Sequence, residues 1–73
     1  MMNRAEHLAW SKERALQYVE MGDIPQASAS MGSDLRKHPE LADHGGLMLM
    51  MMELLAGTIK TPDQMRQCIE GFN

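Results

Sequence analysis

The sequence predicts an all-α fold, a small bundle of four short helices. Apolar residues recur at helical spacing in four segments, and capping residues, glycine or proline bound each segment. No stretch alternates apolar and polar residues with the β-branched enrichment that is typical of a strand. Because a chain of 73 residues is too short for two hydrophobic cores, residues 1–73 are expected to form a single helical domain.

The first helix is predicted from about Arg4 to Met21. Asn3 and Glu6 have the three-residue spacing of a capping box, in which two side chains satisfy main-chain N–H groups at the helix start. Gly22 can adopt the left-handed conformation that ends a helix. The apolar stripe of this helix is expected to contain Ala5, Leu8, Ala9, Ala15, Leu16 and Val19.

The second helix, capped by Asp23, is predicted to end near His38. Pro25 falls in the first turn, where its missing N–H group costs little, and Pro39 disfavours helical geometry in the residue before it. Gly32 and the nearby serines lower the helix propensity, so this helix depends on packing against its neighbours. Its buried stripe is expected to contain Ile24, Ala27, Met31 and Leu35.

A third helix is predicted from Pro39 to Ala56, with Gly57 at its end. It contains the segment GLMLMMMELLAG, in which eight of twelve residues are Leu or Met. Gly45 and Gly46 interrupt the pattern, so a bend or a two-piece helix is compatible with the sequence. Its inward stripe is expected to contain Leu41, Leu47 or Met48, Met51, and Leu54 or Leu55.

The Leu- and Met-rich segment has more than one interpretation. The expected one is a central helix packed by the other three, because a helix that is apolar on all sides must be covered. The alternative is a helix partly exposed in the monomer and covered by a second subunit or a target, since Met-rich surfaces adapt to varied partners. Membrane binding is not expected, because the run is far shorter than the roughly 20 residues of a membrane span and no basic face flanks it.

A fourth helix is predicted to begin at Thr61 and to end at about Glu70. Thr61, Pro62 and Gln64 form the T-P-D-Q pattern of a capping box with proline at the first helical position. This helix carries apolar residues on one face and is followed by a glycine. Phe72 is then expected to fold back on the bundle.

Charge and residue chemistry exclude several functional classes. Seven Lys and Arg against ten Asp and Glu give a net charge of −3, so no basic face for nucleic acid is expected. His38 and His44 have the spacing of some zinc ligands, but no cysteine pair accompanies them, and we predict no metal and no cofactor. Cys68 is the sole cysteine and is expected to be a small buried residue rather than a nucleophile. We therefore predict that the protein is not an enzyme.

The cysteine content and the first residues of the sequence are compatible with a cytoplasmic location. A single cysteine permits no internal disulfide and is compatible with a reducing compartment. The segment MMNRAEHLAW lacks the apolar region that is typical of a secretory signal.

The first two helices resemble a single tetratricopeptide-type hairpin over about 34 residues, one repeat length. Arg14 and Asp34 depart from that pattern, because the repeat usually has Leu and Ala at these positions. One repeat cannot bury its own face, so we expect an antiparallel helical hairpin and transfer no peptide-groove residues. The resemblance is carried by Ala15, Tyr18, Gly22, Asp23, Ala27 and Pro39.

Trp10 is the first candidate for a contact with another protein. On a helical projection it lies almost opposite the apolar stripe of its helix, among polar and charged residues. An exposed Trp in such surroundings is a common hot-spot arrangement, whereas the alternative is a Trp covered by Phe72 or a loop. The predicted partner-binding residues are Trp10, Glu13, Arg14, Gln17, Met50 and Met52.

Four segments of the chain form a recognisable set: NRAEHLAW, the GD pair at residues 22–23, SDLRKHPE and TPDQMRQCIEGFN. Together they resemble a group of short proteins of tailed bacteriophages, and the resemblance spans nearly the whole chain. The resemblance implies expression in a host bacterial cytoplasm and supplies no catalytic or binding residues. We expect a small interaction module that binds and modulates a host protein, such as transcription or defence machinery. The alternative is a homodimeric structural or assembly component with the Met-rich helix at the subunit interface.

Overall fold

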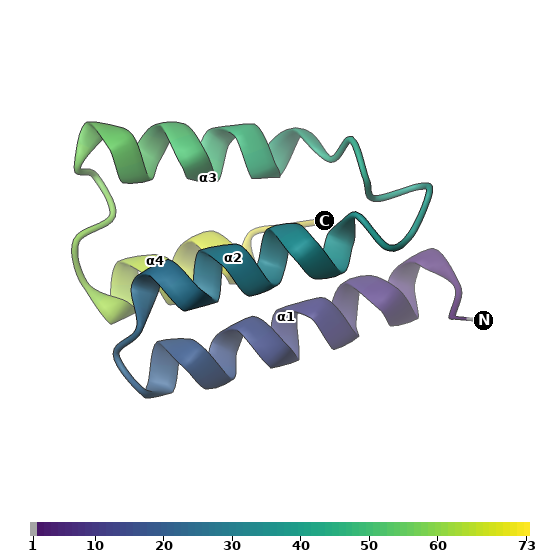
Figure 1. Cartoon of the computed structure of the whole chain (residues 1–73), viewed down its shortest axis with the longest axis horizontal. Helices are drawn as coiled ribbons and strands as arrows, with labels where there is room; N and C mark the ends of the chain where they lie inside the picture. The colour runs from purple at the N-terminus through teal and green to yellow at the C-terminus, as the bar shows by residue number, and fades with distance from the viewer. Residues whose placement is uncertain (1) are drawn as a thin grey trace.

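The computed structural model describes residues 2–73, and within them it contains four α-helices and no strand (Figure 1). The predicted all-α bundle of four short helices is therefore confirmed. The helices are α1 (Arg4–Glu20), α2 (Ile24–Leu35), α3 (Gly45–Ala56) and α4 (Pro62–Glu70).

The residues predicted to start and end the helices have the expected effects. The side chain of Asn3 accepts a hydrogen bond from the Glu6 N–H at 2.8 Å, and Glu6 accepts one from the Asn3 N–H at 3.2 Å. The same pair of hydrogen bonds starts α4 at Thr61. Gly22 and Gly57 follow α1 and α3 with φ angles of 76° and 78°, which residues with a side chain rarely adopt.

The connection between α2 and α3 differs from the prediction. Helix α2 ends at Leu35 rather than near His38, and residues 36–43 form turns, so the predicted helix start at Pro39 is wrong. His44 has extended backbone geometry, and its Nδ1 atom accepts a hydrogen bond from the Gly46 N–H at 2.9 Å. This histidine therefore caps α3, which begins at Gly45.

The core is formed by α1, α2 and α4, with contributions from the connections and from one face of α3. Helices α1 and α2 form an antiparallel hairpin, and α4 packs against both of them (Figure 1). The buried apolar side chains are Leu8, Ala15, Val19, Ala27, Met31, Leu35, Leu41, Leu47, Met50, Ile59, Met65, Ile69 and Phe72.

Helix α3 lies along the edge of the bundle, and its backbone makes few close approaches to the other helices (Figure 1). It buries Leu47 and Met50 and partly buries Leu54. The expectation of a central helix packed by the other three is therefore wrong. The physical reason is that α1, α2 and α4 already bury one another's apolar stripes, so α3 covers the remaining side of the core with one face only.

The segment after α4 folds back as predicted and contacts the starts of α1 and α3. Phe72 is only 4% exposed, and its ring lies 5.1 Å from the ring of His44. The main-chain oxygen of Asn73 accepts hydrogen bonds from Nη2 of Arg4 and from Nε2 of His44, both at 2.7 Å. A Cβ atom on Gly46 would lie 2.8 Å from Cε2 of Phe72, so the absence of a side chain at Gly46 admits the ring.

Candidate protein-interaction surface

Helix α3 carries a second apolar stripe that faces away from the core. We call this set the outward stripe, and its side chains are between 52% and 85% exposed. The spacing i, i+3, i+4, i+7 places them on one face over two helical turns. A surface helix needs one apolar stripe to join its own core, so the outward stripe is apolar surface beyond that need. The outward stripe consists of Met48, Met51, Met52 and Leu55.

The outward stripe contains no charged residue. Glu53 is the only charged residue of α3, and it lies on another face of the helix, near Cys68. Leu49 is also exposed, at 61%, but it points about 110° away from the mean direction of the stripe, whereas the four members point within about 50° of that direction. An apolar partner could therefore cover the stripe without burying a charged side chain of the stripe.

Two hollows border the outward stripe, one beside α2 and one beside the connection between α2 and α3. One, of about 280 Å³, has a wall of small α2 residues, Ser28, Ala29 and Gly32, opposite Met51. The other, of about 490 Å³, lies at the start of α3. Small residues let another chain approach the backbone of α2 closely, so a helix placed on the stripe can fill the hollows with its side chains. The larger hollow is lined by Arg36, Ala42, Asp43, His44, Gly45, Leu47, Met48 and Met51.

The two methionines predicted to contact a partner have different positions. Met52 is exposed in the outward stripe, but Met50 is only 1% exposed and belongs to the core. Met50 is therefore wrong as an exposed contact residue. Met51, which was expected to point inward, is exposed instead. Hydropathy alone could not orient the helix, because apolar residues occupy nearly every position of α3.

Trp10 is partly exposed and contacts charged groups rather than Phe72. The guanidinium of Arg14 lies 4.9 Å from the centre of the indole ring, and the ammonium of Lys37 lies 5.7 Å from it. The ring of His7 is 5.2 Å away. The indole therefore covers a cluster of polar contacts between α1 and α2, where cation–π attraction contributes to packing.

Glu13 and Gln17 are not part of this cluster. Both are exposed and line a shallow groove along α1 together with Ala9 and Leu16. The four residues predicted to form one contact site on the first helix therefore lie in two places, Trp10 with Arg14 and Glu13 with Gln17.

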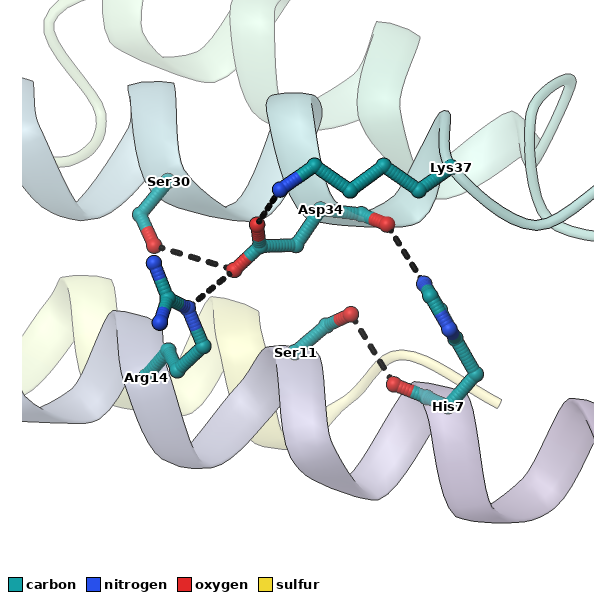
Figure 2. Close-up of polar contacts among 6 residues, drawn as sticks. All are labelled: His7, Ser11, Arg14, Ser30, Asp34 and Lys37. Atoms are coloured by element: carbon teal, nitrogen blue, oxygen red, sulfur yellow. Dashed lines mark hydrogen bonds and ion pairs between the residues drawn. The ribbon is translucent and has the colours of Figure 1, made fainter. Parts of the chain in front are cut away.

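Asp34 is the centre of the polar cluster (Figure 2). Its side chain is 3% exposed, and its carboxylate accepts hydrogen bonds from Nε of Arg14 at 2.7 Å and from Nζ of Lys37 at 3.2 Å. Its main-chain oxygen accepts a hydrogen bond from Nε2 of His7 at 2.6 Å. Arg14 and Asp34 are the two departures from the tetratricopeptide pattern, so both departures belong to one ion pair between the helices.

The remaining histidines and acidic residues form no metal-binding cluster in the described part of the chain. Across residues 2–73, no three His, Cys, Asp or Glu side chains come close enough to hold a metal ion. His38 and His44 accept main-chain hydrogen bonds from Glu40 and Gly46, which uses one ring nitrogen of each. None of the described helices combines the length and apolar character required to cross a membrane.

Burial raises the pKa of the Cys68 thiol, and the negative charge of Glu53 raises it further. We therefore expect Cys68 to react with iodoacetamide more slowly than a cysteine in a short peptide at the same pH.

The unfolded chain ionises the Cys68 thiol near its ordinary pKa of about 8.5, whereas the folded chain retains the proton to higher pH. Below about pH 8.5 the thiol is protonated in both states, so the shift does not reduce stability there. As pH rises further the unfolded chain loses the proton first, so the free energy of unfolding falls.

Chemical unfolding as a function of pH tests this expectation. The wild-type chain should lose more stability above pH ~8.5 than Cys68→Ala does. Parallel curves for the two proteins would contradict it.

No protein-family model matches the chain, and no curated protein or solved structure shows significant similarity to it.

Proposed function

We propose that this chain is a small protein-interaction module that acts by binding another protein through the outward stripe of α3. The observation that carries this proposal is the second exposed apolar stripe on a helix that already uses another face for the core. Covering the four side chains would contribute roughly 1–2 kcal/mol each, which is a substantial driving force for association. Because the stripe has helical spacing, its natural occupant is another helix.

The resemblance to proteins of tailed bacteriophages makes a bacterial host protein the first candidate partner, and modulation of that protein is the corresponding role. Trp10 and Arg14 are a second candidate contact region, since the indole remains partly exposed beside two cations. A second candidate function is that of a homodimeric structural or assembly component. The absence of charge from the outward stripe favours it, because such a surface can pack against its own copy.

A photo-crosslinking amino acid placed at Met52 tests the proposed contact surface. The protein is produced in bacterial cells with the crosslinker at Met52 or, as a control, at Glu20, which is exposed at the end of α1. We expect irradiation to join the Met52 variant to a protein chain, with no equivalent product from the Glu20 variant. The mass of the product separates a second copy of this 8.2-kDa chain from another protein. Equal products from both positions, or none, would contradict the proposal.

A further inference from the structure

We infer that the outward stripe pairs with the outward stripe of a second copy, as two antiparallel α3 helices related by a two-fold axis. This inference rests on the proposed role of the stripe as a protein contact and names its occupant. A two-fold interface uses the same patch on both subunits, so the patch must be complementary to itself. A stripe of Met and Leu without charge meets this condition.

The stripe geometry defines the register of the pair. An axis midway between Met51 and Met52 places Met51 opposite Met52 of the partner subunit. The same axis places Met48 opposite Leu55 of the partner subunit. Methionine side chains are flexible, so they can fill the spaces between two helices without an exact fit. The small residues of α2 beside Met51 leave room for the partner's side chains in the hollow of about 280 Å³.

Charges at the two ends of the stripe favour the antiparallel orientation. Asp43 lines the hollow at the start of α3, and the side chain of Lys60 lies over Gly57 at its end, with Cε 3.4 Å from the position of a Cβ atom there. Neither residue belongs to an ion pair among residues 2–73. An antiparallel copy brings Asp43 towards Lys60 of the partner subunit at both ends, whereas a parallel copy would bring like charges together.

Arg36 and the helix dipoles are compatible with the same orientation. Arg36 lines the hollow beside Asp43 and has no ion-pair partner within the described residues. In the antiparallel pair it lies near the carbonyl end of the partner's α3, where a cation is favourable. Antiparallel helices also place opposite dipole ends side by side.

The pair is expected to be weak, because the contact between two short helices is small. A helix of 12 residues is about 18 Å long, so one pair of such helices is a small interface. An interface of standard size covers about 800 Å² of each partner, which is about a sixth of the 4642 Å² surface of this chain. Only the hollows beside α2 enlarge the contact beyond the two helices.

Sedimentation equilibrium over a wide concentration range tests self-association. We expect the wild-type protein to change reversibly from monomer to dimer, and Met52→Glu to weaken the dimer at least about tenfold, because two carboxylates would meet near the axis. Leu49→Glu is the matched control, since it adds the same charge to an exposed position of the same helix outside the stripe. A wild-type monomer at all concentrations, or equal weakening by both substitutions, would overturn the inference.

Disulfide trapping in a Cys68→Ser background tests the orientation. Oxidation of an equimolar mixture of Met48→Cys and Leu55→Cys proteins should give mainly the mixed dimer. Two antiparallel helices bring these positions together across the axis and keep each away from its own copy. Disulfide dimers of each variant alone, without an excess of the mixed product, would overturn the antiparallel pair.

The crosslinking experiment at Met52 separates failure of this inference from failure of the proposed function. A monomer that crosslinks to a different protein would overturn the self-pairing and leave the interaction module in place. A monomer without a protein product would overturn both. Co-sedimentation of the monomer with phosphatidylglycerol vesicles, lost in Met52→Glu and retained in Leu49→Glu, would overturn both in favour of a lipid surface.

Discussion

Replacing Phe72 with alanine is expected to lower the free energy of unfolding by about 3–5 kcal/mol, the usual cost of removing a buried aromatic ring. Phe72 is 4% exposed and packs against Gly46 and His44 at the start of α3. A domain of 73 residues has a total stability of about 4–11 kcal/mol, so the loss is a large fraction of it. Urea unfolding followed by circular dichroism, at one fixed protein concentration, measures the change.

Two adjacent glycines supply the matched control for this contact. Gly46→Ala places a methyl group within 3.0 Å of two ring atoms of Phe72, so the ring must move, and we expect a loss of about 1–3 kcal/mol. A Cβ atom on Gly45 would have no atom within 4 Å. Gly45 is the first residue of α3, so Gly45→Ala should stabilise the protein by less than the roughly 0.5–1 kcal/mol of a helix interior. The cost of Gly46→Ala should fall once Phe72 is alanine. An unchanged urea midpoint in Phe72→Ala would contradict the assigned role of the ring.

The parts of the fold that depend on short-range signals were predictable from the sequence. The capping residues Asn3 and Thr61 and the helix-ending residues Gly22 and Gly57 act within a single turn, so their patterns predict helix ends directly. Pro39 was misleading because a proline is equally suited to the first turn of a helix and to a turn. The main-chain hydrogen bonds of residues 36–44 select the turn.

The outward stripe could not be located from the sequence for a different reason. An amphipathic helix is oriented by the contrast between its apolar and polar faces, and α3 has almost no such contrast. Once the core position of Met50 is known, the stripe follows from helical geometry. The pairing of Arg14 with Asp34 likewise requires the register of α1 against α2, although each residue stands out in the sequence as a departure from the repeat pattern.

The ion pair between Arg14 and Asp34 is expected to show strong coupling in a double-mutant cycle with the residues that the tetratricopeptide pattern has at these positions. Asp34→Ala removes the shared acceptor of two cations, and we expect a loss of about 1.5–3 kcal/mol, the value of hydrogen bonds to a charged group. The loss does not exceed this because both cations are half exposed and can turn to solvent. Arg14→Leu leaves the buried carboxylate with only Lys37 and Ser30, and we expect about 2–3 kcal/mol.

The double variant Arg14→Leu with Asp34→Ala should lie within about 1 kcal/mol of the wild-type protein. Replacing the buried carboxylate and its half-exposed partner with apolar residues removes the cost of desolvating the carboxylate along with its hydrogen bonds. The loss of the cation–π contact between Arg14 and Trp10 accounts for a remaining deficit of about 0.5–1 kcal/mol. The two single losses would then be strongly non-additive, which is the mark of a direct interaction.

The ion pair between Arg66 and Asp63 is the control for this cycle. Its atoms are 2.9 Å apart, close to the 2.7 Å of Arg14 and Asp34, but the Asp63 side chain is 83% exposed. An exposed pair of this kind contributes about 0.2–1 kcal/mol, because water and salt screen it. If urea unfolding gave the Arg14–Asp34 pair no greater coupling than the Arg66–Asp63 pair, burial of Asp34 would not be what makes the contact strong. The polar cluster would then position Trp10 without holding α1 and α2 together.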